Sequence, residues 1–502
     1  MSPPTNPVWM RGRRSLLFYF TCAGVLLAVL FAFSGTFPRR LAEPESYPRP
    51  GSSKPLWGQG TTTWRFDAAR DARNLGLSDE QCDVAFPDLY TELYRARDHL
   101  GRQSVKPMHV QIYKERKPWP HAQVHVLIHS GQMYIIDEMK GACDRMRGLA
   151  GLANLYRAIA AVPDPRTIPN VEFILDLEDT PALDAPDDRI VWGWNRPRDR
   201  LKTWVAPDFD GWAVSNSSLF PPSKADQQRQ FPNPDLGSYV SFRERLHHTE
   251  QPFDSKIPKA VWRGSPNNAV REALLSVVEA SEKASTPNTT PSSSSSSADE
   301  SWADVRKMSE HRMHMAEFCK YQFPIHTEGV AWSGRLRYLQ NCESASIVHQ
   351  PLQHHAHYYD LLVAEGPEQN YIAVRNDWAD LEEKVAFYRA NPAAARRVAR
   401  NSARTFRDRY LTPAAEACYW RRMIRTWAEV QAWKPERYVD VMQADGSVWK
   451  KQRGVDWEVF AAVDPHYPLD FPGYEGSREK EKEDGGKKDG GGKKGGKKGA
   501  GS

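Results

Sequence analysis

Apolar residues in the first half of the chain fall into short runs separated by stretches with helical spacing. Compact apolar runs predict strands, and apolar residues that recur every three or four positions predict helices. The expected strands are residues 125–128, 133–136 and 171–177, and the expected helices are residues 75–100 and 143–161. Because Ser130 and Gly131 lie between the first two strands, we expect these strands to form a hairpin.

The second half of the chain shows the same alternation more regularly. The expected strands are residues 259–262, 321–326, 345–350 and 371–374, and the expected helices are residues 269–282 and most of 378–433. Strands that alternate with helices are typical of α/β layers with parallel sheets, which we predict for both halves. The proline-rich, aromatic stretch 208–233 is the expected crossing between them.

Segments without such patterns mark the boundaries of the chain's parts. Residues 284–298 form a serine-rich insertion that cannot pack a core, and we expect it to be solvated. The predicted organisation is a cytoplasmic N-terminus (1–14), a transmembrane signal-anchor (15–37), a stem (38–60), an N-terminal domain (61–235), a C-terminal domain (236–435), a C-terminal extension (436–475) and a disordered Lys/Gly tail (476–502).

Residues 16–33 form an apolar run without a charge. At about 1.5 Å per residue, such a helix just spans a hydrocarbon layer of roughly 30 Å. Arginines before the run favour a cytoplasmic N-terminus, although a cleaved signal peptide is the alternative. Either way residues 60–475 reach the lumen of the secretory pathway, where Asn216 and Asn288 would be glycosylation acceptors.

Charge and cysteine content agree with this placement. The formal net charge of +5 is concentrated at the two ends of the chain, so the body has no basic excess and a nucleic-acid partner is excluded. Of the six cysteines, Cys22 lies in the apolar run and the others show no metal-binding spacing. Up to two disulfides with one thiol left over fit an oxidising compartment, and the spacing leaves the pairing open.

Arg263, Gly264 and Ser265 follow one predicted strand and precede a predicted helix. Such a turn brings a guanidinium group, a hydroxyl group and helix N-terminal amides to one point at the carboxyl edge of a sheet. These groups suit a diphosphate. A structural arginine paired with a nearby carboxylate is the alternative interpretation of Arg263.

A second strand-to-helix turn contains Glu328, Gly329, Ser333 and Arg335. Cations normally avoid the first turn of a helix because the helix dipole disfavours them there. Arg335 therefore indicates an anion bound beside it. Arg337, two residues further on, is expected to be a solvated surface charge.

Together these motifs resemble glycosyltransferase family 90, which contains protein O-glucosyltransferases and fungal capsule-associated xylosyltransferases. The resemblance covers roughly residues 165–430. It rests on these segments: Trp262-Arg263-Gly264-Ser265, Tyr321–His326 leading to Glu328-Gly329, Trp332-Ser333-Gly334-Arg335-Leu336-Arg337-Tyr338-Leu339, Tyr358-Tyr359 and Tyr371-Ile372-Ala373-Val374. It implies an α/β protein of GT-B type with two facing Rossmann-like domains, a UDP-sugar donor, inversion at the anomeric carbon and no need for a metal. The implied donor-binding residues are Arg263, Gly264, Ser265, Glu328, Gly329, Ser333 and Arg335.

The resemblance also implies that Asp179 is the catalytic base, on the acceptor side of the site. Inverting transfer needs a carboxylate that takes the proton of the acceptor hydroxyl group. Thr180 departs from the aromatic residue that the family usually has at that position, and Asp176 and Glu178 are nearby competitors. Asp176 is better interpreted as a strand-end carboxylate bonded to the backbone.

Two polar motifs are candidates for a metal site, and a group of tryptophans is a candidate for a sugar-binding surface. Residues 208–210 match the DxD pattern and residues 354–357 are rich in histidine, but neither has a supporting set of ligands, so we expect no metal. Trp192, Trp194 and Trp212 would either stack on a sugar acceptor or pack in the core.

We therefore predict an inverting glycosyltransferase that moves xylose or glucose from a UDP-sugar to a hydroxyl group of a protein or glycan. It would face the lumen from the Golgi or endoplasmic reticulum membrane as a single-pass type II protein, without a cofactor. A glycoside hydrolase or a non-catalytic carbohydrate-binding protein is the alternative. The identity of the sugar depends on pocket shape, which spacing does not reveal.

Overall fold

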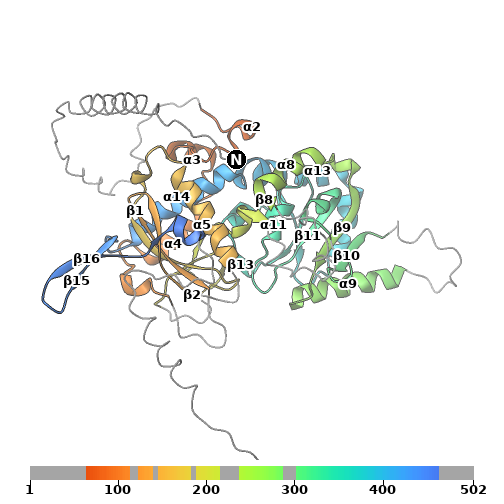
Figure 1. Cartoon of the computed structure of the whole chain (residues 1–502). Helices are drawn as coiled ribbons and strands as arrows, with labels where there is room; N and C mark the ends of the chain where they lie inside the picture. Colours follow the sequence, from red (N-terminus) through yellow and green to blue (C-terminus); the bar gives the residue numbers. More distant parts are fainter. Residues whose placement is uncertain are drawn as a thin grey trace, which may run out of the picture. The chain divides into compact units, whose positions relative to one another are not determined.

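The structure is a computed structural model that describes residues 64–112, 122–139, 145–181, 188–214, 237–285, 301–311 and 313–462 (Figure 1). All of these residues belong to one compact unit. No helix among them is long and apolar enough to cross a bilayer. The predicted membrane anchor, the stem, the tail and the glycosylation acceptors Asn216 and Asn288 lie outside the described residues.

The first sheet has six strands in the order β17-β2-β1-β3-β4-β6. They are β1 (Gln123–His129), β2 (Gln132–Met139), β3 (Val171–Asp176), β4 (Trp192–Gly193), β6 (Trp204–Val205) and β17 (Val455–Asp456). β1 and β2 form the predicted hairpin, and Gly131 in its turn has a φ of 76°. Because β1 runs antiparallel to both neighbours while β3, β4 and β6 are parallel, the sheet is mixed, and the expectation of a parallel sheet in this half is wrong.

The helices of this half come from both ends of the described chain. They are α2 (Ala68–Asp71), α3 (Asp79–Ala85), α4 (Thr91–Leu100), α5 (Arg145–Ala160), α14 (Pro413–Val430) and α15 (Trp457–Ala462). Pro87 disfavours helical backbone at the preceding residue, which explains why one expected helix is divided into α3 and α4. α14 packs against α4, α5 and β3, so a late segment completes the core of the first sheet.

The second sheet is parallel throughout, with the order β10-β9-β11-β12-β14. Its strands are β9 (Ile257–Gly264), β10 (Ala303–Lys307), β11 (Tyr321–His326), β12 (Ile347–Gln350) and β14 (Ile372–Arg375). Numbered along the chain, these strands lie in the order 2-1-3-4-5. That is a doubly wound arrangement, in which the chain reverses its direction of winding between β9 and β11 and ligands bind at the carboxyl ends of those two strands.

Helices connect these strands and continue beyond them. They are α8 (Tyr239–Thr249), α9 (Ala269–Ser285), α11 (Arg335–Leu339), α12 (Leu381–Ala390), α13 (Pro392–Ser402) and the π-helix η7 (Ala403–Tyr410). The smaller elements are β5 (Arg196–Pro197), β7 (Ala213–Val214), β8 (Gly237–Ser238), β13 (His354–His355), β15 (Tyr438–Met442), β16 (Val448–Gln452) and 3-10 turns that include η3 (Phe209–Gly211) and η5 (Met315–Lys320). β10 was not expected from the sequence.

Two disulfides connect distant parts of the described chain. Cys82 of α3 is bonded to Cys418 of α14, and Cys319 is bonded to Cys342 just after α11. This agrees with the expected maximum of two disulfides in the body. The first bond fixes the late helix α14 to the start of the described chain, across a sequence separation of 336 residues.

Candidate active site

Two loops leave the carboxyl ends of β9 and β11, where the doubly wound sheet reverses. A side chain at Gly264 would place its Cβ 2.3 Å from the ring of Trp262, and one at Gly329 would place its Cβ 3.2 Å from Nη2 of Arg271. The absence of side chains therefore lets the two loops approach their neighbours closely. These glycines are the ones that the sequence motifs predicted at this edge.

Arg335 and Arg271 stand in the first turns of the helices that follow these loops, and the charge of Arg271 acts on Arg335. Arg335 is the first residue of α11, and its Nη1 donates a hydrogen bond to the carbonyl oxygen of Arg263. Arg271, in the first turn of α9, donates from Nε to Thr327 Oγ1 at 3.1 Å and to the carbonyl oxygen of Glu328 at 2.9 Å. Its Nη1 also donates to the carbonyl oxygen of Ser265 at 3.2 Å, so Arg271 ties the two loops together.

Both arginines carry charge that no neighbouring carboxylate balances. Within the described ranges, neither Arg271 nor Arg335 lies within ion-pair distance of an acidic side chain. Burial and, to a smaller extent, the positive charge of Arg271 lower the pKa of Arg335 to about 9. Burial also lowers the pKa of Arg271 to about 10. Both remain cations at neutral pH, so an anion bound here would offset their unfavourable burial.

His326 lies beneath this pair at the end of β11. Its side chain is fully buried, and neither ring nitrogen has a hydrogen-bond partner among the residues that the structure describes. Burial, His349 and the two arginines together hold the pKa of His326 well below its usual value, so the ring is neutral. A neutral imidazole in this position adds no charge to the anion site.

Arg263 has a different environment from the other two arginines. Its Nη2 donates to both carboxylate oxygens of Asp304, at 2.7 and 2.8 Å, and its Nη1 donates to the carbonyl oxygens of Trp262 and Asp304. The residue is 1% exposed. This geometry favours the alternative of a structural arginine, which fixes β9 to β10 and presents its carbonyl oxygen to Arg335.

Glu328, Ser265 and Ser333 occupy distinct positions around the anion site. The carboxylate of Glu328 accepts hydrogen bonds from the backbone amides of Gln353, at 2.9 and 3.0 Å, and of His354, at 2.7 Å. Glu328 thus holds the loop after β12 in place. Ser265 is exposed and Ser333 is half-buried, so both hydroxyl groups remain accessible to a ligand.

Asp179 lies in the loop after β3, on the edge of the first sheet. Nη1 of Arg147, on α5, donates to Asp179 Oδ1 at 2.9 Å, and Asn195 donates to the Asp179 carbonyl oxygen at 2.8 Å. The Asp179 side chain is 44% exposed, so it can reach an acceptor. Asp176 is fully buried and accepts from the backbone amide of Glu178 at 3.0 Å, which agrees with its interpretation as a strand-end carboxylate.

Arg337 is buried, and the expectation of a solvated surface charge is wrong. Its side chain has no exposed surface and lies between Asp208, with Nε 3.3 Å from Oδ1, and Glu416, with Nη1 3.0 Å from Oε2. Glu416 belongs to α14 and Asp208 precedes η3, so two distant segments create this site for a cation. Burial of the triad fixes α11 against both segments.

Asp210 connects the Asp179 side of the site with the start of α11. A Cβ at Gly334 would lie 2.1 Å from Asp210 Oδ2, so the carboxylate rests against the residue just before Arg335. Burial and the negative charges of Asp208 and Asp179 raise the pKa of Asp210 to about 7, against the opposing charges of Arg337 and Arg147. The sequence offered one signal for this contact, a glycine directly before the predicted helix.

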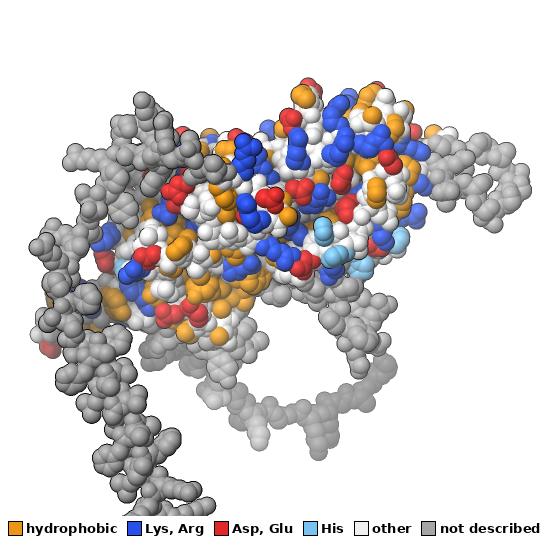
Figure 2. All heavy atoms as spheres, turned by 90° about the horizontal axis from the view of Figure 1, so that it is seen from above, with side chains coloured by type: hydrophobic (Ala, Val, Ile, Leu, Met, Phe, Trp, Pro, Cys, Tyr) orange, Lys and Arg blue, Asp and Glu red, His pale blue; other side chains and the backbone are white. Residues whose placement is uncertain are grey.

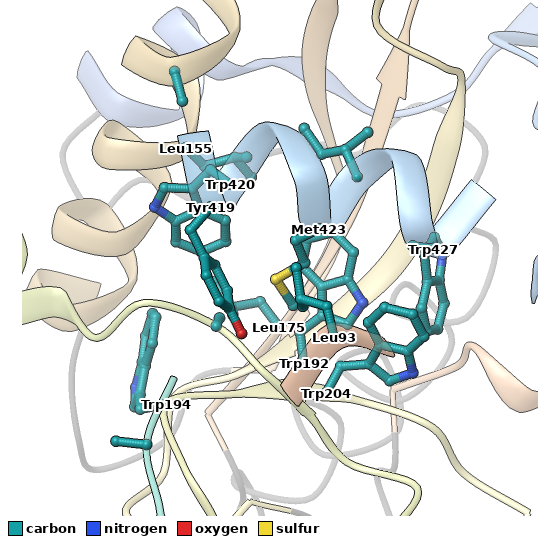
Figure 3. Packing of buried hydrophobic residues seen from close by; sticks show 14 of the residues in the cluster. Leu93, Leu155, Leu175, Trp192, Trp194, Trp204, Tyr419, Trp420, Met423 and Trp427 are labelled. Atoms are coloured by element: carbon teal, nitrogen blue, oxygen red, sulfur yellow. The ribbon is translucent and has the colours of Figure 1, made fainter. Parts of the chain in front are cut away.

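The tryptophans expected to form an acceptor platform belong mainly to the core. Trp192 and Trp194 have no exposed surface, and Figure 3 shows Trp192 among the apolar side chains beside α14, with Trp194 further from that helix. Trp192 stacks on Phe173 with ring centroids 3.5 Å apart. Their burial corrects the platform hypothesis for these two residues. Trp212 is half-buried, with the guanidinium group of Arg157 4.9 Å from its ring.

Within the described residues, one group has metal-ligand geometry: Glu92, His355 and Asp360. The Glu92 carboxylate already accepts hydrogen bonds from Arg95 at 2.7 Å and from Arg196 at 2.7 Å, so its charge is balanced by arginines. The histidines of residues 354–357 face different partners, since Glu328 lies beside His354 and Glu92 beside His355.

Comparison with known proteins decides the family. Residues 99–461, well over half of the chain, match the family described as Glycosyl transferase family 90. The chain belongs to glycosyltransferase family 90. The chain is similar to protein O-glucosyltransferase 2 of Danio rerio, 24% identical over 63% of this chain and 57% of the relative. Protein O-glucosyltransferase 3 of Mus musculus is 31% identical over 24% of each chain, and O-glucosyltransferase rumi of Drosophila pseudoobscura pseudoobscura is 23% identical over 54% of this chain and 63% of the relative. The chain thus spans less than two thirds of the length of these relatives.

Arg271 is the residue of this family 90 site that sequence reasoning missed. The signal was available, because Arg271 stands in the first turn of a predicted helix, as Arg335 does. Arg335 was chosen because the helix dipole disfavours a cation in the first turn of a helix, and the same reason applies to Arg271.

Proposed function

We propose that this member of family 90 is an inverting glycosyltransferase of GT-B type that uses a UDP-sugar as donor. The observation that carries the proposal is the pair Arg271 and Arg335, two partly desolvated cations without a carboxylate partner in the described part of the chain. They lie where a doubly wound sheet binds nucleotides. A diphosphate carries the negative charge that would balance these two arginines.

The donor side of the proposed reaction is built from the loops after β9 and β11. Arg271 and Arg335 stabilise the diphosphate, and the hydroxyl groups of Ser265 and Ser333 add hydrogen bonds. Negative charge develops on the departing UDP as the bond to the anomeric carbon breaks. Preorganised donors at such a developing charge commonly lower a barrier by about 3–4 kcal/mol for each group.

Asp179 is the proposed base on the acceptor side. The acceptor oxygen attacks the anomeric carbon from the face opposite UDP, and its proton passes to Asp179 Oδ2, while Arg147 holds Oδ1. The new bond forms on the opposite face, so the anomeric configuration inverts. The exposure of Asp179 favours it as the base over Asp176 and Asp210, because those two residues are 0% and 7% exposed.

The remaining features of the proposal follow from the relatives and from the disulfides. Relatives named as protein O-glucosyltransferases favour a protein acceptor and glucose as the sugar, and the family resemblance keeps xylose as the alternative. Two disulfides suit the lumen of the secretory pathway, where a Golgi or endoplasmic reticulum membrane anchor would hold the protein. We propose that the reaction needs no metal.

Calorimetry with UDP and a screen of UDP-sugar turnover with mixed acceptors test this function. The proposal expects UDP binding and release of UDP from one donor in the presence of acceptor. A glycoside hydrolase would leave UDP unbound and cleave glycosides instead. A non-catalytic carbohydrate-binding protein would show no turnover of any UDP-sugar, and either of these results would overturn the proposal.

A further inference from the structure

A row of arginines follows α13 into the π-helix η7. Arg397 and Arg400 lie on α13, and Arg404 and Arg407 lie on η7. At about 1.5 Å per residue, the row is about 15 Å long. Figure 2 views the side on which α8 and α13 lie in Figure 1, and basic side chains gather there on the second half of the chain. These four residues are called the arginine groove below.

The arginine groove is a cavity as well as a charged row. A cavity of about 520 Å³ is lined by the four arginines together with Glu343, Asn401, Ala403 and Asp408. Asn401 closes one side, because its Nδ2 donates to the carbonyl oxygens of Pro367 and Gln369 at 2.8 and 3.0 Å. π-helical turns are rare and occur frequently at functional sites. Here the π-helix forms part of the wall of the cavity.

The charges of the arginine groove are only partly balanced. Arg407 donates to Asp408 at 2.8 and 3.0 Å, and Arg404 donates to Glu368 at 2.5 Å. In the described ranges of the chain, Arg397 and Arg400 have no hydrogen bond and no ion pair from their side chains. Like charges three or four residues apart on a helix destabilise it, so an anion between them would relieve this repulsion.

We propose that the arginine groove binds a linear anionic polysaccharide. Guanidinium groups bind carboxylate and sulfate-like oxygens through paired hydrogen bonds, and the unpaired Arg397 and Arg400 provide two such groups one turn apart. The length of the row suits a chain with several anionic groups. Glu343 and Asp408, which pair with Arg407, also line the cavity and place carboxylate oxygens beside the row, to which the hydroxyl groups of sugars can donate.

The lining of the cavity argues against other anionic partners. It contains no aromatic ring, so it offers no surface on which nucleic-acid bases stack. Ala403 is its one apolar residue, so it offers no surface for an acyl chain or an apolar peptide side chain. This site is separate from the anion site of Arg271 and Arg335, and the inference stands without the proposed transfer reaction.

Binding of a fluorescent heparin fragment and of polygalacturonate to the full-length protein tests this inference, with neutral dextran as the unbound reference. The variant Arg397→Gln/Arg400→Gln should weaken binding of both polysaccharides at least about tenfold and flatten its salt dependence. The control Arg166→Gln/Lys283→Gln removes the same charge from exposed side chains that are paired elsewhere. We expect less than a twofold change for the control and unchanged UDP affinity for both variants.

Three results would overturn the inference. The first is absence of polysaccharide binding by the unaltered protein at physiological salt. The second is an equal loss of affinity in the groove and control variants, which would show attraction to net charge alone. The third is binding of phosphatidylserine vesicles that depends on Arg397 and Arg400 while polysaccharide binding does not, which would assign the groove to a membrane surface.

Discussion

Replacing Arg335 by glutamine should change protein stability and donor binding in opposite directions. Burial lowers the pKa of Arg335 from its higher ordinary value to about 9. The unfolded chain therefore holds this proton more tightly than the folded protein, and the charged side chain destabilises the fold at every pH below about 9. The penalty disappears as the pH rises from about 9 through the ordinary value.

The magnitude follows from the size of that change in pKa. The depression of the Arg335 pKa to about 9 corresponds to about 5 kcal/mol at about 1.4 kcal/mol per unit. Water at the exposed part of the side chain and the contact of Arg335 with the Phe318 ring, 5.5 Å away, offset part of it. We therefore expect Arg335→Gln to stabilise the ligand-free protein by about 1–3 kcal/mol, which raises Tm by about 1–2 °C per kcal/mol in a chain of this size.

UDP should reverse the order of stability. Loss of a charge-assisted hydrogen bond costs about 1.5–3 kcal/mol, or roughly 10- to 150-fold in affinity. At a UDP concentration about 100 times the Kd of the unaltered protein, ligand binding stabilises that protein by about 2.7 kcal/mol. The variant gains much less, so its advantage in Tm should shrink or reverse.

Thermal melts in phosphate-free buffer, with and without UDP, measure both effects. Arg263→Gln is the matched control, because it leaves Asp304 without its bidentate partner and should lower Tm in both conditions. The reasoning fails if Arg335→Gln lowers Tm without ligand as much as Arg263→Gln does. It also fails if UDP raises the Tm of the variant as much as that of the unaltered protein.

Three further predictions concern the buried polar groups and the metal. Because the pKa of Asp210 in the folded protein is raised to about 7, the free energy of unfolding should fall as the pH rises from about 4 through 7. In urea unfolding, Asp210→Asn should flatten this dependence on pH. An unchanged dependence would contradict the raised pKa of Asp210. Arg337→Ala should cost about 3–5 kcal/mol because Asp208 and Glu416 lose their counter-charge, whereas Arg306→Ala, at an exposed site, should cost under about 0.5 kcal/mol in the same assay. Excess EDTA should leave transfer intact, and loss that manganese restores would revive residues 208–210 as metal ligands.

The second sheet was largely predictable because its signals are local. Each buried strand with its following turn, as in β11 and the loop through Glu328 and Gly329, is encoded within about ten residues. The same holds for the choice of Arg335, which depends on the direction of the helix that it begins. β10 escaped prediction because a short, half-buried strand beside the serine-rich insertion lacks an apolar pattern.

The features that were missed depend on contacts between distant segments. The sequence around Arg337 predicts a surface charge. Arg337 is buried because Glu416 and Asp208 approach it from elsewhere in the chain. Trp192 is buried because α14 returns to cover the first sheet, with Trp427 at 5.6 Å between ring centroids. β17 pairs with β2 although it lies more than 300 residues later in the chain, and the residue spacing within either segment does not predict that pairing.

The most direct test of the central claim is the comparison of UDP affinity and transfer rate in Asp179→Asn. Asp179 acts on the proton of the acceptor, so calorimetry should show UDP affinity within about twofold while turnover falls by about 10²–10⁴. Asp210→Asn, measured beside it, should retain most of its turnover. Near-normal transfer in Asp179→Asn with loss in Asp210→Asn would contradict the account, because the buried carboxylate would then be the base.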